Sequence, residues 1–372
     1  MRVLARAQEL EAQGRDIVHM EIGEPDFPTP APIVAAARRA LDDGLTRYTP
    51  AAGLPALREA IAGYYADRLG TSVSPGRILV TPGASGALNL VLASVLNPGD
   101  GVLLADPGYP CYRQLVGLLG ARARLLPLSA DTGFKLTAEL AAAAWTPDLR
   151  CILVASPANP TGAVLSQAEL ADLYALTRDR GAVLIVDEIY QGLVYDAPDH
   201  TALQVGAEGI FIVNSFSKYF GMTGWRLGWV VGPPAMEQIL DRVAQNLYLA
   251  SPTLAQHAAL AAFGEDSLTE MDARREEFHR RRDVLSDGLL SLGFSLPICP
   301  QGAFYLYADA SAFGRSGTEF SDQLLEHAGV AVTPGSDFGR VDAERFLRFA
   351  FTTDLARLAQ GQQRLAAYVS QL

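Results

Sequence analysis

The amino-acid sequence predicts an α/β protein of two domains, the larger with a mostly parallel, doubly wound sheet and helices on both faces. The chain has 372 residues, more than a single hydrophobic core usually accommodates. Short apolar runs recur through its middle, and most are separated by helical stretches, which is the pattern of a parallel sheet covered by helices. After residue 250 this pattern changes. We therefore expect a large domain over residues 41–250 and a small α+β domain built from residues 1–40 with 251–372.

Five apolar runs, each bounded by Gly, Pro or polar residues, are predicted strands of the large domain. They are Ile78–Val80, Val102–Leu104, Cys151–Ala155, Ala182–Val186 and Ile210–Val213. A sixth run, Trp225–Val231, follows closely behind its predecessor, and we expect it to enter the sheet antiparallel. Open α/β sheets bind ligands beyond the carboxyl ends of their strands, so the residues after each run are the place to look for function.

The expected small domain begins with a helix and contains further helices and strands. Ser251-Pro252 resembles a helix N-cap followed by a proline at the first helical position, with the helix continuing over Thr253–Phe263. The charged segment Asp266–Leu292 predicts a long solvated helix with Arg and Glu on its outer face. Gly302–Tyr307 and Arg345–Phe351 are predicted strands, and the tail from Asp354 is predicted to be helical.

Composition and charge favour a protein that acts on small molecules. The formal net charge of -11 argues against a nucleic-acid-binding surface. Cys111, Cys151 and Cys299 are too scattered for a disulfide framework or a thiolate metal site, and we expect them buried in a reducing cytosol. Met1–Gln13 predicts an amphipathic helix rather than a secretion signal. No apolar run approaches the ~20 residues that cross a bilayer, so we expect a soluble, cytoplasmic protein without a metal.

Residues 214–229 carry the strongest chemical signal. Lys218 directly follows a predicted strand, close to the hydroxyl residues Ser215 and Ser217, and Arg226 comes eight positions later. A lysine amine forms an imine when desolvation and nearby cations keep part of it unprotonated. Arg226 offers a charged fork for a phosphate, and the two hydroxyls are further donors. The segment favours a phosphate-bearing carbonyl cofactor, although a lysine taken alone is more often solvated in a loop.

A glycine turn after the first predicted strand is a candidate anion site. Thr81-Pro-Gly-Ala-Ser-Gly leads into a predicted helix over Ala84–Leu96. The free backbone amides and the positive end of the helix dipole would face an anion there. Such turns are common in α/β proteins, so this one by itself does not indicate a function.

Two further strand ends carry polar groups. Asp187 follows the buried run Ala182–Val186, where a carboxylate needs a partner such as a protonated pyridine nitrogen. A helix cap or a structural ion pair would also explain it. Tyr190 is spaced to lie near Asp187 if the chain turns helically. Asn159-Pro-Thr-Gly has the composition of a tight turn, and it would present an amide able to hydrogen-bond a phenolic oxygen.

Four motifs in this order resemble the signature set of the class I and II aminotransferases, which are fold type I pyridoxal-phosphate enzymes. The motifs are Asn159-Pro-Thr-Gly, Asp187-Glu-Ile-Tyr190, Ser215-Phe-Ser-Lys218 and Gly224-Trp-Arg226-Leu-Gly. The likeness extends over nearly the whole chain, from Gly23-Glu-Pro-Asp-Phe to Arg348. Any single motif could arise by chance, but the ordered set is specific.

The resemblance implies a role for each matched residue at the cofactor ring. Lys218 would hold pyridoxal 5'-phosphate as a Schiff base and then carry the proton of the substrate Cα. Asp187 would pair with the pyridine N–H, so that the ring acts as an electron sink. Tyr190 and Asn159 would hydrogen-bond the phenolic oxygen, and Tyr109 would stack on the ring.

The resemblance also implies the groups around the phosphate. They are Ser215, Ser217, Arg226, the turn at Gly83, Ala84 and Ser85, and a tyrosine matching Tyr48 that reaches over from a neighbouring subunit. An active site shared in this way implies a homodimer.

At the substrate, Arg348 matches the family arginine that binds the α-carboxylate as a bidentate pair. Arg345 is the rival candidate, but the spacing to the end of the chain fits Arg348 better. Gly23, through its backbone, and Asn159 would lie near the same carboxylate. This sequence departs from many relatives at Thr352, where alanine is common, and in the turn at Gly83, which lacks a common Lys or Gln.

The implied reaction is a ping-pong transfer of an amino group from an amino acid to a 2-oxo acid. Aspartate, glutamate, alanine and aromatic amino acids all stay open as donors. A carbon–sulfur β-lyase would use the same cofactor site and is the main alternative. A regulatory ligand-binding module is a remote one, because only a short helix precedes Gly23 and the net charge is acidic.

Overall fold

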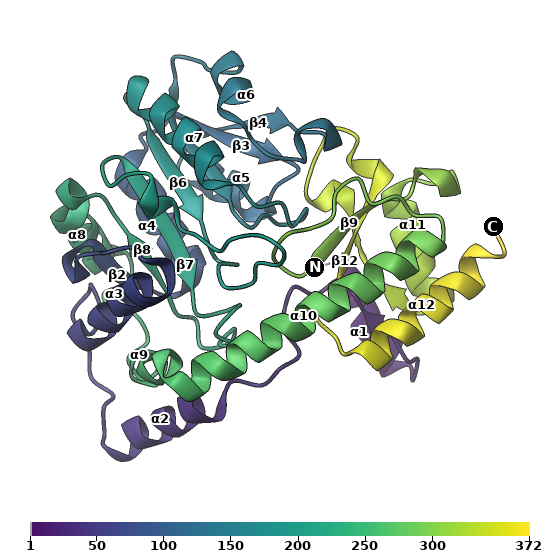
Figure 1. Ribbon diagram of the computed structural model, residues 1–372, viewed down its shortest axis with the longest axis horizontal. Coiled ribbons are helices and arrows are strands. Elements are labelled where there is room, and N and C mark those ends of the chain that lie inside the picture. The colour runs from purple at the N-terminus through teal and green to yellow at the C-terminus, as the bar shows by residue number, and fades with distance from the viewer. Residues whose placement is uncertain (1) are drawn as a thin grey trace.

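A seven-stranded sheet forms the centre of the protein, shown in Figure 1 as a computed structural model that describes residues 2–372. The strand order is β2-β8-β7-β6-β5-β3-β4. The strands are β2 (Ile78–Thr81), β3 (Gly101–Asp106), β4 (Arg122–Pro127), β5 (Leu149–Ala155), β6 (Val183–Asp187), β7 (Ile210–Ser215) and β8 (Gly228–Val231). Neighbours from β7 through β4 run parallel, whereas β8 is antiparallel to both β2 and β7.

All six apolar runs contribute strands to this sheet, and the expected antiparallel entry of Trp225–Val231 is confirmed for its second half, β8. β4 was not predicted from the sequence. This strand lies at the edge of the sheet, and its residues are exposed or only half-buried. Its alternation of Arg122 and Arg124 with alanine and leucine therefore gives no continuous apolar run.

Helices cover both faces of the sheet, as predicted. Successive residues of a strand point to opposite faces, and the central strands accordingly divide between two hydrophobic clusters. Leu103, Ile152 and Leu184 belong to one cluster. Val102, Leu153 and Ile185 belong to the other. The helices of this part are α3 (Pro55–Leu69), α4 (Gly83–Val95), α5 (Pro110–Leu118), α6 (Ala138–Ala143), α7 (Gln167–Asp179) and α8 (Glu237–Leu247).

Two smaller sheets are formed by chain segments from both ends of the sequence. β9 (Tyr305–Asp309), β12 (Phe346–Ala350) and β11 (Thr333–Pro334) form an antiparallel sheet, and β1 (Val18–His19) pairs in parallel with β10 (Val330–Ala331). The remaining α-helices are α1 (Arg2–Ala12), α2 (Ala31–Asp42), α9 (Thr253–Ala259), α10 (Glu265–Ser291), α11 (Gly317–Gln323) and α12 (Leu355–Val369). In Figure 1, α10 runs from the end of the molecule with α2 and α9 to the end with α12. The domain bounds given above stay a prediction.

The helix start expected at Ser251 is displaced by one residue. Pro252 occupies the N-cap position of α9 and provides no side-chain cap. The Ser251 hydroxyl instead donates to the carbonyl of Val80 at 3.0 Å. A tertiary contact has replaced the local cap, and α9 gives way to a 3₁₀ turn at Leu260–Phe263.

Two other expectations need correction. Not every arginine of α10 lies on its outer face, because Arg281 and Arg282 are buried. They form ion pairs with Asp26 and Asp196 on segments that pack against the helix. Of the three cysteines only Cys151, in a central strand, is buried, whereas Cys111 and Cys299 are exposed because they lie at the start of a helix and in a loop.

The predicted N-terminal helix Met1–Gln13 corresponds to α1, although Met1 lies outside the described residues. None of the helices within residues 2–372 has the length and apolar character that a membrane crossing requires.

Candidate active site

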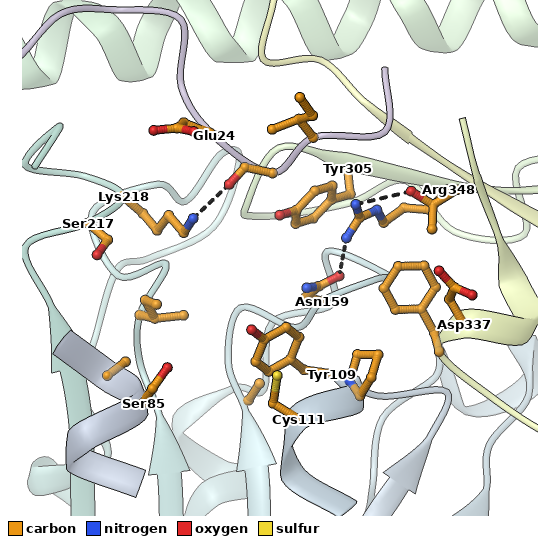
Figure 2. A pocket seen from close by; sticks show the side chains of 18 of the residues that line it. Glu24, Ser85, Tyr109, Cys111, Asn159, Ser217, Lys218, Tyr305, Asp337 and Arg348 are labelled. Atoms are coloured by element: carbon orange, nitrogen blue, oxygen red, sulfur yellow. Dashed lines mark hydrogen bonds between the residues drawn. The ribbon is translucent and has the colours of Figure 1, made fainter. Parts of the chain in front are cut away.

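A cavity of about 910 Å³ opens at the carboxyl ends of the parallel strands, and side chains from both the large and the small sheets line it. Figure 2 shows Lys218 and Arg348 on opposite sides of this space, with Asn159 and Tyr109 between them. Most of the site residues expected from the sequence line the cavity. These are Gly23, Ala84, Ser85, Tyr109, Asn159, Asp187, Tyr190, Ser217, Lys218, Arg226 and Arg348.

Lys218 lies three residues beyond the end of β7, and its amine points across the cavity. Nζ donates a hydrogen bond to the backbone carbonyl of Gly23 at 2.6 Å. Burial is the main reason why the pKa of the amine falls from 10.5 to about 8; Glu24 opposes the shift, and the nearby charges of Arg348 and Arg226 contribute to it. Roughly a tenth of the amine is therefore unprotonated at pH 7, far more than for an ordinary lysine, and this is the form that a nucleophilic lysine requires.

Asp187, the last residue of β6, is a buried carboxylate that is 2% exposed. It accepts hydrogen bonds from the Tyr112 hydroxyl at 2.7 Å and from the backbone N–H of Ile189 at 3.0 Å. Burial raises its pKa from 3.8 to about 6, although both hydrogen bonds act in the opposite direction. No basic side chain within residues 2–372 forms an ion pair with it. The carboxylate thus supports a local turn and also lines the cavity without a cationic partner.

Arg348, in the middle of β12, points into the cavity and is 6% exposed. Its Nη1 donates to Asn159 Oδ1 at 2.9 Å, and its Nη2 donates to the Glu21 carbonyl at 2.6 Å. The guanidinium lies between the rings of Tyr305 and Phe338, 4.1 and 4.6 Å from their centroids. These contacts fix the plane of the fork.

The rival arginine, Arg345, is placed elsewhere. It forms an ion pair with Asp309 at 2.6 Å, and it is not among the residues that line the cavity. Of the two candidates for the carboxylate-binding arginine, only Arg348 reaches the cavity.

Aromatic side chains form another part of the cavity wall. The hydroxyls of Tyr190 and Tyr305 are hydrogen-bonded at 2.9 Å. Tyr109 packs edge-on against Tyr112, with ring centroids 5.4 Å apart. Tyr112 and Tyr305 were not predicted as site residues from the sequence. The spacing of Tyr112 three residues after Tyr109 in a helix was a usable signal, whereas Tyr305 reaches the site only through the pairing of β9 with β12.

The N-terminus of α4 and the guanidinium of Arg226 meet beside the cavity. Gly83 begins the helix with φ +73°, and a Cβ at this position would lie 2.6 Å from Arg226 Nη2. Glycine therefore permits the arginine to approach the helix end. Ala84 and Ser85 line the cavity there, where helix amides and a cation favour an anion.

Three expected site residues do not line the cavity. Gly83 lies just behind its wall. The buried Ser215 hydroxyl is hydrogen-bonded to the Leu227 carbonyl at 3.0 Å and to Ser217 Oγ at 2.9 Å. Ser217 is therefore the serine that reaches the cavity, and Ser215 holds it in place. Tyr48 is 83% exposed on the surface of this chain, and its contact with a second subunit stays a prediction.

Comparison with known proteins agrees with this architecture. The family "Aminotransferase class I and II" matches residues 15–365. The valine–pyruvate aminotransferase of Mycobacterium tuberculosis is 37% identical over 367 residues, covering 98% of this chain and 94% of that protein. The aspartate/prephenate aminotransferase of Thermus thermophilus is also 37% identical, with 98% and 94% covered.

Solved structures show the same likeness. A crystal structure of an aminotransferase from Mycobacterium tuberculosis superposes with a TM-score of 0.97 at 37% identity, covering 100% of this chain and 96% of that one. Aspartate aminotransferase from Thermus thermophilus with maleate gives a TM-score of 0.93 at 36% identity, with 98% and 95% covered. The predicted family and fold class are confirmed, and the chain belongs to the class I and II aminotransferases.

Proposed function

We propose that this aminotransferase binds pyridoxal 5'-phosphate through Lys218 and transfers an amino group from an amino acid to a 2-oxo acid by a ping-pong mechanism. The observation that carries the proposal is that three groups meet at one cavity. They are an amine of lowered pKa, a buried carboxylate without a cation, and an arginine at a helix N-terminus. Each matches a different part of the cofactor.

The residues present fit this cofactor. A protonated pyridine nitrogen would supply the cation that Asp187 lacks within residues 2–372, and ion pairing would then keep the carboxylate charged. Arg226 forms no ion pair in the same part of the chain, so its charge is available to a phosphate. The amides at the start of α4 and the Ser217 hydroxyl would complete the phosphate site.

The reaction uses residues on both sides of the cavity. When bound, pyridoxal phosphate supplies an electron sink that stabilises negative charge at the substrate Cα. Arg348 binds the substrate carboxylate with its fork, and Asn159 and the two flanking rings fix the orientation of that fork. The Lys218 amine, once free, accepts the Cα proton, and its lowered pKa suits this role near neutral pH.

The chemistry of Lys218 is testable because the chain has only two lysines, Lys135 and Lys218. Lys135 forms an ion pair with Glu169 at 3.1 Å and does not line the cavity, so Lys135→Ala is a matched control. The cofactor complex should be reduced with borohydride and its peptides analysed by mass. The label is expected on Lys218, and Lys218→Ala should abolish both turnover and the absorbance of the lysine–cofactor Schiff base.

Cofactor attached to Lys135, or full turnover by Lys218→Ala, would refute the proposal. Product analysis separates the β-lyase alternative. Transamination converts the cofactor to its amine form, whereas elimination releases pyruvate, ammonia and a thiol.

We also propose a homodimer in which Tyr48 reaches the phosphate site of the neighbouring subunit. Two observations support this proposal. The chain belongs to a family for which a shared active site is expected, and the large Tyr48 side chain lies exposed near the exposed Leu45. Sedimentation should give twice the monomer mass, and Tyr48→Ala should weaken cofactor binding. A monomer with full activity would contradict this. The cytoplasmic location is likewise a proposal.

A further inference from the structure

Among the described residues 2–372, few basic side chains of the cavity are available to a second substrate carboxylate. The basic residues that line it are Arg113, Lys218, Arg226 and Arg348. The proposed function uses the last three for the cofactor and for the α-carboxylate. Among the lining residues this leaves Arg113 as the cation that is free to contact a substrate side chain.

Arg113 lies beside an acidic residue of the same cavity. Its Nη2 donates to the backbone carbonyl of Asp337 at 3.1 Å. The Asp337 carboxylate forms no hydrogen bond or ion pair with the residues from 2 to 372. Figure 2 shows Asp337 on the Arg348 side of the cavity, away from Lys218. A second substrate carboxylate near Arg113 would therefore also be near Asp337.

Two further acidic residues line the same cavity. Glu21 accepts a hydrogen bond from His19 Nδ1 at 2.8 Å, and that bond is the main reason why the pKa of His19 rises to about 9. Glu21 therefore has its own cation. Glu24, which is exposed, accepts a hydrogen bond from the Thr223 hydroxyl at 2.5 Å. Apart from the residues assigned to the cofactor and the α-carboxylate, the lining has an excess of acid.

Apolar side chains form part of the same wall, beside the polar Thr333 and Ser336. Val3 and Leu4 of α1, Ile22 and Phe338 all line the cavity. Val3 packs into a small hydrophobic cluster with Ala7, Leu10 and Ile17. Leu4, by contrast, is half-exposed and joins none of the hydrophobic clusters among residues 2–372. Core packing thus accounts for Val3 but leaves Leu4 facing the cavity.

We infer that this cavity selects amino acids with uncharged, apolar side chains and 2-oxo acids with a single carboxylate, and that it disfavours aspartate and glutamate. The inference rests on the proposed function, because it assigns Lys218, Arg226 and Arg348 to the cofactor and the α-carboxylate. An apolar side chain would lose water against Leu4, Ile22 and Phe338. A second carboxylate at Arg113 would lose hydration next to the carboxylate of the neighbouring Asp337, which would repel it.

A donor panel tests the inference separately from the proposed function. The holoenzyme should be mixed with each amino acid in the absence of an acceptor. The conversion of the cofactor to its amine form should then be monitored by its absorbance. We expect valine, leucine and phenylalanine to react with kcat/KM roughly tenfold or more above aspartate and glutamate. Pyruvate should exceed 2-oxoglutarate and oxaloacetate as acceptor in the reverse half-reaction.

The outcomes are distinguishable. If the protein shows no cofactor absorbance, or if none of the amino acids converts the cofactor to its amine form, the proposed function is refuted and the inference with it. A normal cofactor spectrum together with fastest reaction of aspartate, glutamate, lysine or arginine would overturn the substrate class alone.

Substitutions identify the residues responsible. Asp337→Asn should raise kcat/KM for aspartate several-fold relative to valine, whereas Asp287→Asn, an exposed acid of α10 outside the cavity, should not. Leu4→Ala should lower kcat/KM for leucine, and the matched control Leu290→Ala, an exposed leucine of α10, should leave it unchanged. If Arg113→Ala selectively abolishes reaction with aspartate, Arg113 is a receptor for a second carboxylate, and the inference is wrong.

Discussion

Arg348 and Asn159 meet within the cavity, where Nη1 of the arginine donates to Oδ1 of the asparagine at 2.9 Å. The bond joins β12 of the three-stranded sheet to the loop after β5 of the seven-stranded sheet. An arginine fork held in this way is pre-oriented for a carboxylate, so little entropy is lost when the substrate binds.

Replacing Arg348 by lysine should raise KM for every amino acid donor and lower kcat/KM by roughly 100-fold, because an ammonium cannot form the bidentate pair. Visible absorbance of the cofactor should persist. Steady-state kinetics with Arg345→Lys as control will check this, since Arg345 is paired with Asp309 outside the cavity. Equal losses in both variants would show that Arg348 does not bind the carboxylate.

The rate at which cofactor-free protein binds the cofactor through Lys218 should increase as pH rises through about 8. This is the value to which burial lowers the pKa of the Lys218 amine. Only the unprotonated amine attacks the aldehyde, so the rate should level off above that pH. Stopped-flow absorbance across a pH series measures the midpoint. Because Glu24 raises the pKa of the amine, Glu24→Gln should move the midpoint down. A midpoint near the ordinary 10.5 of lysine would contradict the assignment.

Substituting Gly83 by alanine should weaken cofactor binding by roughly tenfold or more. The residue has φ +73°, and the added methyl would lie 2.6 Å from Arg226 Nη2. The arginine must then move away from the helix N-terminus. Equilibrium titration with cofactor provides the measurement, and Gly117→Ala is the control, because a Cβ there meets no atom within 4 Å. Unchanged affinity would show that Arg226 and the α4 N-terminus do not hold the phosphate together.

Arg281→Ala should lower the free energy of unfolding by about 3 kcal/mol. The side chain is 3% exposed and pairs with Asp26 at 2.8 Å, and the guanidinium carbon lies 4.8 Å from the centroid of the Phe27 ring. Arg280→Ala is the matched control on the same helix. It removes a pair with Glu277 in which the arginine side chain is 65% exposed, so it should cost less than about 1 kcal/mol. Urea denaturation of the two variants compares them directly, and equal losses would refute the prediction.

Glu188 should make the protein less stable as pH rises from about 5 to 8. Burial raises its pKa from 4.5 to about 8, although the Ala202 N–H and the Thr201 hydroxyl favour the charged form. The folded chain therefore keeps a proton that the unfolded chain releases in this window. The free energy of unfolding that Glu188 contributes is fully present below pH 4.5. It falls as the pH approaches 8, by on the order of 1 kcal/mol per pH unit. Glu188→Gln should flatten this slope in urea titrations at several pH values. A slope identical to that of the parent protein would refute the assignment.

The sequence by itself determined the strands of the large sheet except β4, the order of the motifs and the main polar residues of the cavity. Runs such as Ile210–Val213 are apolar because a central parallel strand is buried on both faces, so their position is visible without tertiary information. The strands in turn predict that Lys218 and Asp187 lie in the same site, because the carboxyl ends of parallel strands lie at one edge of the sheet. The four ordered motifs then indicated the family.

Only the tertiary structure decided how the second sheet completes the cavity. Tyr305, Phe338 and Leu4 reach it from β9, from the turn after β11 and from α1, and nothing in their local sequence indicates that approach. Ser215 and Ser217 are equivalent in sequence, yet the Leu227 carbonyl takes the Ser215 hydroxyl and leaves Ser217 at the cavity. Arg281 is charged and lies in a polar stretch, but Asp26 comes from a segment 255 residues away to pair with it. Contacts of this kind depend on long-range packing. A local sequence pattern does not indicate which distant residue will be the partner.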